Sequence, residues 1–280
     1  MASYADARAA GGRWLLRIED VDTPRCSRVA EQEIMRQLAV YGFEADAAVI
    51  RQSERYQKYE AALARLAPDN RLFACACTRK ILGSAPQIAL GEVIYPGRCR
   101  DLAIALSAPA TALRLRVHAD ADAQVAFTDR ALGAFTQNVA SAVGDFILRR
   151  ADGLYAYQLA VVVDDAEQGV SDVVRGEDLL MNTPRQIYLQ HLLGYASPRY
   201  LHVPLAKNDA GEKLSKQTRP AAIADDNAIA TLNLAWTFLR QPEMGHVASV
   251  THFWRQAIAH WDPALMWSVA GADIAPDNTS

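Results

Sequence analysis

Two short apolar runs each end at charged residues, and this pattern constrains the fold more than any other feature. Residues 14–16 form the first run, within a predicted strand at residues 13–18, and the acidic residues Glu19, Asp20 and Asp22 follow that strand. The second run, residues 173–174, leads into Arg175. Buried parallel strands are apolar throughout, and open α/β sheets bind ligands at the carboxyl ends of their strands. The sequence therefore predicts an α/β fold with a parallel sheet and a binding site at its strand ends.

Helices are predicted around these strands. They cover residues 2–10, 27–41, 53–66 and 183–193, and a glycine follows three of them at positions 11, 42 and 194. Glycine just beyond an apolar periodic segment is a typical helix end. Beyond residue 216 the chain is again apolar and helical in pattern, which predicts a small C-terminal helical lobe.

A hairpin is predicted between residues 146–150 and residues 155–163. Both runs are strand-like, and Asp152-Gly153 between them is a strong turn signal. Asp164 and Asp165 would then end the second strand. As a pair they could hold a metal or a ribose hydroxyl, and capping of the following turn explains them at least as well.

Composition narrows the class of protein. The 280 residues contain no long apolar run and no signal-like N-terminus, so we expect a cytoplasmic protein without a membrane span. The formal net charge of −3 argues against a generally basic nucleic-acid surface. Any contact with RNA must therefore use a local basic patch. Separately, we expect the protein to be a monomer.

Lys213 and Lys216 are three residues apart with Ser215 between them, and they follow a polar turn that contains glycine. Lysines on such a loop can neutralise the charge that builds up on a polyphosphate in a transition state. Taken alone, these residues are explained as readily by a solvated basic loop.

Three cysteines and a tyrosine form a second group. Cys75 and Cys77 are separated by one residue, and Tyr95 precedes Cys99 by four. Thiolates together with one phenolic oxygen can complete a tetrahedral zinc shell. Buried free thiols are an equally good explanation of the Cys-x-Cys pair, and Cys26 lies outside the pattern.

Four blocks of the sequence resemble the successive motifs of glutamyl-tRNA synthetases, in the same order. They are residues 17–20, 157–165, 174–180 and 212–217, the last with KLSKQ in place of the KMSKS signature of class I aminoacyl-tRNA synthetases. The resemblance implies a Rossmann-like parallel sheet. It also implies a catalytic core at residues 1–70 and 133–205, a zinc-bearing insertion at 71–132, and a signature loop with a helical lobe at 206–280.

The resemblance assigns roles to individual residues. Glu19 would take the α-ammonium of glutamate, Tyr157 would hydrogen-bond the substrate, and Arg175 would pair with a substrate carboxylate through its planar fork. The other implied roles are catalysis by Lys213 and Lys216, ATP binding by Ser215 and Lys216, and zinc binding by Cys75, Cys77, Tyr95 and Cys99. ATP would act as a co-substrate with Mg²⁺. Without the family resemblance, each residue has a simpler explanation. Glu19 would form an ion pair with Arg17, Tyr157 would be an aromatic residue of a sheet, and Arg175 would form a salt bridge with Glu177 or Asp178.

Length selects a subfamily. About 64 residues follow Lys216, which is short for an anticodon-binding domain. The family members without that domain, the glutamyl-Q tRNA(Asp) synthetases, attach glutamate to the queuosine base in the anticodon loop of tRNA(Asp). The resemblance thus implies glutamate, ATP and tRNA(Asp) as binding partners.

The first family motif has no counterpart in this sequence. Family members open with a strand, a turn and a HIGH-type motif that contacts ATP, whereas residues 3–8 resemble the helix that follows that motif. We therefore expect the first strand to be missing and an open sheet edge beside residues 13–18. The alternatives are a fragment of a glutamyl-tRNA synthetase that charges the 3′ end of tRNA, and an inactive paralogue that binds tRNA.

Overall fold

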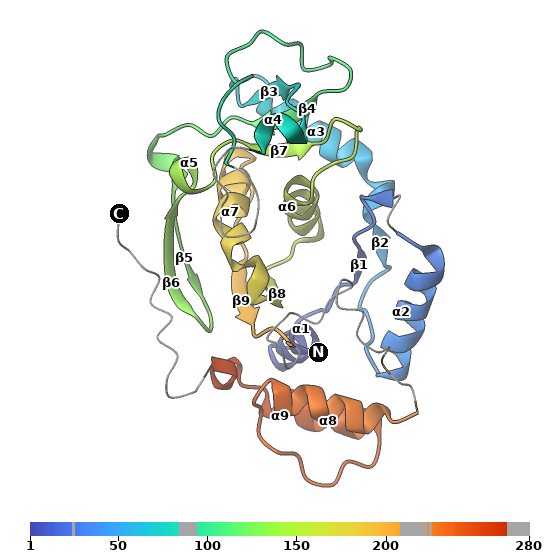
Figure 1. Ribbon diagram of the computed structural model, residues 1–280. Coiled ribbons are helices and arrows are strands. Elements are labelled where there is room, and N and C mark those ends of the chain that lie inside the picture. Colours follow the sequence, from blue (N-terminus) through green and yellow to red (C-terminus); the bar gives the residue numbers. More distant parts are fainter. Residues whose placement is uncertain (24–25, 84–93, 208–222, 224–225, 268–280) are drawn as a thin grey trace.

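The computed structural model describes residues 1–23, 26–83, 94–207, 223 and 226–267. Helix α6 (Tyr157–Gln168) lies near the middle of the molecule, with sheets and helices around it (Figure 1). The described strands form three sheets of two, three and four strands. No helix of the described part is both long and apolar enough to cross a membrane.

The four-stranded sheet has the order β6-β5-β9-β8. Strands β8 (Asp172–Gly176) and β9 (Arg199–Val203) are parallel, and Arg175 lies opposite His202. Strand β5 (Gln124–Asp129) is parallel to β9, and β6 (Gly133–Asn138) is antiparallel to β5. The expected parallel sheet is therefore present as part of a mixed sheet.

The first predicted strand is shorter than expected. Only Arg17–Ile18 form a strand, β1, which pairs in parallel with β2 (Ile50–Arg51) in a sheet of its own. Residues 12–17 and β8 instead line a common cavity. Among the described residues, β8 has no strand partner on the side away from β9.

The remaining sheet is antiparallel and has the order β3-β4-β7. It contains β3 (Leu72–Cys75), β4 (Ala112–Leu115) and β7 (Phe146–Arg149). Strand β7 thus joins two strands of the segment 71–132, whereas β5 of that segment pairs with β9. The predicted boundary at 132/133 falls in the turn between the paired strands β5 and β6.

The hairpin expected at residues 146–163 is correct only at its turn. Gly153 has a φ of +87° and the peptide N–H of Arg150 donates to the carbonyl of Leu154, but the chain then enters helix α6 at Tyr157. The prediction of a strand at 155–163 is therefore wrong. Residues 158–165 of this helix are all buried, so the sequence lacks the polar face that reveals a helix.

The predicted helices are present as α1 (Ala2–Ala9), α2 (Arg28–Val40), α3 (Tyr56–Leu66) and α7 (Thr183–Leu192), and α8 (Ala228–Phe238) and α9 (Val250–His260) lie in the region beyond residue 216 that was expected to be helical. The short helices α4 (Arg79–Leu82) and α5 (Val139–Ala142) were not expected from the sequence. The C-terminal helical lobe consists of α8 and α9, which pack with α1 around Tyr4, Trp236 and Trp254. Helix α2 buries none of its residues, and Val29 and Ile34 remain 75% and 52% exposed.

Candidate active site

A cavity of about 660 Å³ lies between α1, residues 12–19, one side of α6 from Tyr157 to Gln168, and β8. Its volume is in the range of small-molecule sites, about 300 to 1,000 Å³. Glu19, Tyr157 and Arg175 all line it, although 138 and 18 positions separate them along the chain. The structure thus brings the three residues predicted to bind glutamate to one cavity.

Arg175 enters this cavity from β8 with its guanidinium held by neutral groups. Its Nε donates to Nε2 of His202 at 3.2 Å, and its Nη1 donates to the side-chain oxygen of Gln186 at 2.7 Å. Its Nη2 donates to the hydroxyl of Thr183 at 2.8 Å and more weakly to the carbonyl of Leu179 at 3.4 Å. The expected two-point fork is therefore partly filled by protein acceptors, which leaves one N–H of Nη1 without a described partner.

No described carboxylate forms an ion pair with Arg175. The alternative pairing with Glu177 or Asp178 is therefore wrong among the described contacts. A guanidinium that is partly buried and held only by neutral acceptors retains its full charge for an anionic ligand.

Tyr157 is the first residue of α6 and faces the same cavity. Burial raises the pKa of its phenol, and the positive charge of Arg175 opposes this effect only in part. The hydroxyl therefore stays protonated at neutral pH and can donate a hydrogen bond. Its position at a helix start, not in a sheet, corrects the alternative interpretation of this residue.

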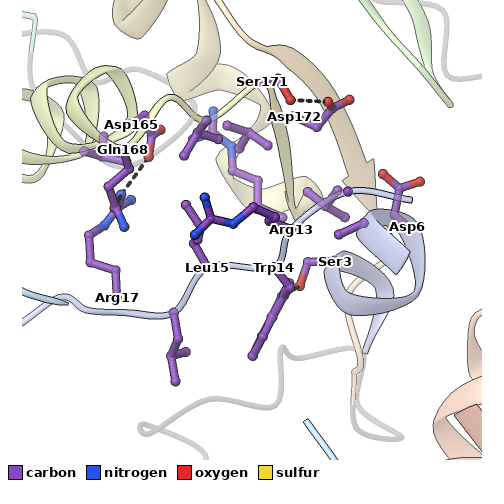
Figure 2. Close-up of a pocket in the computed structure, with 18 of the residues that line it drawn as sticks. Ser3, Asp6, Arg13, Trp14, Leu15, Arg17, Asp165, Gln168, Ser171 and Asp172 are labelled. Atoms are coloured by element: carbon purple, nitrogen blue, oxygen red, sulfur yellow. Dashed lines mark hydrogen bonds and ion pairs between the residues drawn. The ribbon is translucent and has the colours of Figure 1, made fainter. Parts of the chain in front are cut away.

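Glu19 lies just beyond β1 and its side chain is 43% exposed. It contacts Arg17, whose Nη2 lies 3.3 Å from a carboxylate oxygen of Glu19. Arg17 has a closer partner in Asp165 of α6 at 2.8 Å, and it also donates to Gln168 at 2.9 Å (Figure 2). Because Asp165 is the closer ion-pair partner of Arg17, the partly exposed carboxylate of Glu19 remains accessible to a cation.

Asp164 and Asp165 lie within α6 and do not end a strand. Asp164 is completely buried and accepts hydrogen bonds from Gln52, Arg55 and Tyr59. It therefore holds the start of α3 against α6. Burial raises the pKa of Asp165, and the nearby Arg17 offsets this only in part. These contacts leave Asp164 no free oxygen for a metal or ribose.

Cys75, Cys77 and Cys99 place their sulfur atoms within 4.8 Å of one another. The sulfurs of Cys77 and Cys99 are 3.6 Å apart, and the Tyr95 oxygen lies 3.5 Å from Cys75 and 3.8 Å from Cys77. Ligands of a tetrahedral zinc ion at usual distances are about 3.8 Å apart for two sulfurs and about 3.5 Å for sulfur and oxygen. The four side chains therefore fit a zinc ion in both chemistry and spacing.

Arg114 of β4 supports this fit. It is only 6% exposed, its guanidinium lies 4.1 Å over the ring of Tyr95, and its Nε has no described hydrogen-bond partner. Burial raises the pKa of the Cys75 thiol, but its hydrogen bonds with Tyr95, with the backbone of Cys77 and with Arg114 outweigh this effect and hold that pKa below its usual value. A buried cation that interacts with Cys75 matches a cluster that carries negative charge.

The residues predicted to act on ATP, Lys213, Ser215 and Lys216, lie outside the described residues. Two groups that contact Arg175 from outside the cavity lining were not expected from the sequence. Gln186 and the pair formed by Asp129 and His202 hold Arg175 from behind. Their positions follow from the pairing of distant strands, which no local sequence spacing reveals.

Comparison with known proteins agrees with this arrangement. The family model of class I tRNA synthetases (E and Q), catalytic domain, matches residues 1–241. Relatives named glutamyl-Q tRNA(Asp) synthetase are 51% identical in Thiobacillus denitrificans and in Dechloromonas aromatica, over 93% of this chain and 86% and 87% of theirs. The chain belongs to the class I glutamyl-Q tRNA(Asp) synthetase family. It is therefore a ligase of the tRNA synthetase class.

Solved structures agree on the fold. The glutamate-tRNA synthetase from Elizabethkingia anophelis superposes with a TM-score of 0.74 at 21% identity, over 95% of this chain. A glutamate tRNA ligase from Elizabethkingia meningosepticum gives a TM-score of 0.75 at 22% identity. This chain spans 62% and 61% of the length of those two proteins. The class I synthetase catalytic fold is thus established.

Proposed function

We propose that this protein activates glutamate with ATP and transfers it to the queuosine base of tRNA(Asp). The names of relatives that are 44% to 51% identical support this substrate pair. The cavity at the strand ends supports glutamate, because it combines an acidic side chain, a phenol and an arginine.

The observation that carries the proposal is the charge of Arg175. Arg175 lines the cavity, its guanidinium contacts only neutral acceptors, and no described carboxylate lies within ion-pair distance of it. An incoming substrate carboxylate would supply the missing negative charge. Since the arginine is already oriented, little conformational entropy is lost when that carboxylate binds.

Glu19 and Tyr157 complete the recognition of glutamate in this proposal. The exposed carboxylate of Glu19 would bind the α-ammonium group, and the protonated phenol of Tyr157 would donate to an oxygen of the substrate. A ligand held by opposite charges at two ends is fixed in both position and orientation. These three residues would discriminate glutamate from substrates that lack either charge.

In the first chemical step, an oxygen of the glutamate α-carboxylate attacks the α-phosphorus of ATP and pyrophosphate leaves. In the second, a hydroxyl of the queuosine nucleoside attacks the acyl carbon and AMP leaves with the bonding electrons. We propose that Lys213 and Lys216 stabilise the leaving pyrophosphate and that Ser215 and Lys216 contact ATP, which enters with Mg²⁺. These roles rest on the KLSKQ sequence.

We further propose that Cys75, Cys77, Tyr95 and Cys99 hold a zinc ion with a structural role. Their spacing closes a four-ligand shell with no position left for substrate, which is typical of structural zinc sites. The proposed division into a core, a zinc-bearing insertion at 71–132 and a helical lobe follows from the same resemblance.

The test combines binding with transfer. Calorimetric titration of L-glutamate into the protein should show saturable binding, and Arg175→Leu should weaken it strongly, because it removes an ionic contact of about 2 to 5 kcal/mol. Arg36→Leu, on the exposed surface of α2, is the matched control and should bind as wild type does. With ATP, labelled glutamate should appear on tRNA(Asp) that carries queuosine.

Nuclease mapping of the labelled tRNA separates the alternatives. Label in the anticodon stem-loop supports the proposal, whereas label at the 3′ end of tRNA(Glu) indicates a glutamyl-tRNA synthetase fragment. Glutamate binding that survives Arg175→Leu removes the assigned role of this residue. A protein that binds tRNA but not glutamate would be the inactive paralogue.

A further inference from the structure

A buried histidine and aspartate stand directly behind Arg175. The three side chains come from three adjacent strands of the four-stranded sheet. Asp129 lies on β5, His202 on β9 and Arg175 on β8. Asp129 and His202 are 1% and 0% exposed. We propose that Asp129 and His202 are positioning residues that orient the guanidinium of Arg175 toward the carboxylate of glutamate, an inference that rests on the proposed function.

The hydrogen bonds fix which ring nitrogen of His202 carries the proton. Arginine can only donate, so the 3.2 Å contact from its Nε requires a lone pair on Nε2 of His202. The proton of the neutral ring must then be on Nδ1, which lies 2.7 Å from an oxygen of Asp129. His202 therefore accepts from Arg175 and donates to Asp129 at the same time.

Asp129 is held as an anion by further donors. Its Oδ1 accepts from the peptide N–H groups of Ala131 and Leu132 at 3.0 and 2.9 Å, and its Oδ2 also accepts from the peptide N–H of His202 at 3.0 Å. Burial raises the pKa of Asp129. The hydrogen bonds from the His202 ring and from the peptide N–H groups of Leu132 and Ala131 outweigh this effect and hold the pKa below its usual value. A permanent carboxylate in turn keeps the histidine proton on Nδ1.

The histidine serves as a neutral spacer between two charges. A carboxylate in direct contact with Arg175 would neutralise the guanidinium and compete with the substrate. In this arrangement the negative charge lies one ring away, so Nε of Arg175 is held while its charge remains available. Gln186 and Thr183 fix Nη1 and Nη2 in the same way, again with neutral acceptors. Together these contacts fix the guanidinium from three sides.

Gln186 extends the network to the helix that carries Tyr157. Its side-chain nitrogen donates to Gln158 at 2.8 Å, and Gln158 donates to Asn182 at 2.5 Å. Gln158 follows Tyr157 directly at the start of α6. The same chain of buried amides thus fixes Arg175 relative to the phenol on the adjacent helix.

Two substitutions at one position test the proposal. His202→Leu removes the acceptor for Arg175, and His202→Gln offers a side-chain oxygen in its place. We expect His202→Leu to raise the Kd for glutamate about ten- to a hundredfold, since a hydrogen bond to a charged group is lost, and His202→Gln to recover part of it. His191→Leu changes an exposed histidine of α7 and should leave glutamate binding unchanged.

Nitrogen NMR measures the tautomer of His202 and the hydrogen bonding of Arg175 directly, without substrate. In the wild-type protein the His202 ring should be protonated at Nδ1 and unprotonated at Nε2. The Nε–H signal of Arg175, assigned by its loss in Arg175→Leu, should be protected from exchange in wild type and in His202→Gln, but not in His202→Leu. A proton on Nε2 in the wild-type protein would overturn the inference whether or not a variant folds, and so would an Arg175 signal that is equally protected in a folded His202→Leu protein.

The outcomes separate this inference from the proposed function. If wild type binds no glutamate but shows the expected histidine tautomer and arginine protection, the proposed function fails and the positioning network stands. If wild type binds glutamate and His202→Leu binds it equally well, only the positioning role fails.

Discussion

His118 lies three residues beyond β4, among positively charged side chains. Its Nε2 is buried without a described hydrogen-bond partner. Burial lowers the pKa of His118, and the charges of Arg71, Arg100 and Arg116 lower it further, while Asp120 opposes them. The folded protein therefore resists protonation of this side chain more than the unfolded chain does.

This difference predicts a loss of stability in mild acid. As the pH falls through about 6.5, the usual histidine pKa, the unfolded chain takes up a proton that folded His118 does not, so the free energy of unfolding decreases. His118→Gln removes this proton uptake. The Tm of wild type should therefore fall more steeply between pH 7.5 and 5 than the Tm of His118→Gln. His191→Gln is the exposed control, and three parallel curves would contradict the prediction.

At the scale of residues, the sequence identifies a site residue only where that residue belongs to a recognisable motif. Glu19, Tyr157 and Arg175 were selected from separate blocks and line one cavity. His202 gave no signal, because its partner Asp129 is 73 positions away and meets it only through strand pairing. Tertiary structure alone determines which residues contact the site residues from behind, whereas the residues that line the cavity belong to recognisable sequence motifs.

At the scale of elements, turns and strand ends were predictable and buried helices were not. The ends of β1 and β8, and the glycines after α1, α2 and α7, lie close to their predicted positions because they depend on local chemistry. Helix α6 was mistaken for a strand, since three consecutive valines favour β-structure and its burial on all sides removes helical periodicity. Tertiary packing decided the conformation there.

The antiparallel sheet β3-β4-β7 offers the test of the metal site. Cys75 ends β3 and Arg114 lies on β4, so a bound ion would connect the loop that carries Tyr95 and Cys99 to this sheet. Purified protein should contain about one zinc per chain, and a strong chelator should remove it and lower the Tm. Cys75→Ser should lose the zinc, whereas Cys26→Ser, at an exposed cysteine outside the cluster, should retain it. Equal zinc in both variants would refute the site.

At the scale of the whole molecule, the two largest of the described hydrophobic clusters lie in different parts of the chain and must be held together. One lies around α3, α6 and α7, and the other contains α1, α8 and α9. Asp6 of α1 is 5% exposed and connects distant parts of the chain. It accepts from Arg130, in the turn after β5, at 2.6 and 2.9 Å and from the indole of Trp261 at 2.9 Å. One carboxylate thus joins the helical lobe to the four-stranded sheet.

Replacing this carboxylate should weaken both connections together. Asp6→Ala leaves a buried indole N–H without its acceptor and Arg130 without its main partner, so we expect about 2 to 4 kcal/mol less unfolding free energy, which allows for the 28% exposure of Arg130. Glu33→Ala, which breaks the exposed pair with Arg36, should lower the unfolding free energy far less than Asp6→Ala does. Urea unfolding followed by tryptophan fluorescence and by circular dichroism measures both. If Asp6 couples the two cores, Arg130→Ala combined with Asp6→Ala costs less than the sum of the single changes; strict additivity would show that the contact joins nothing.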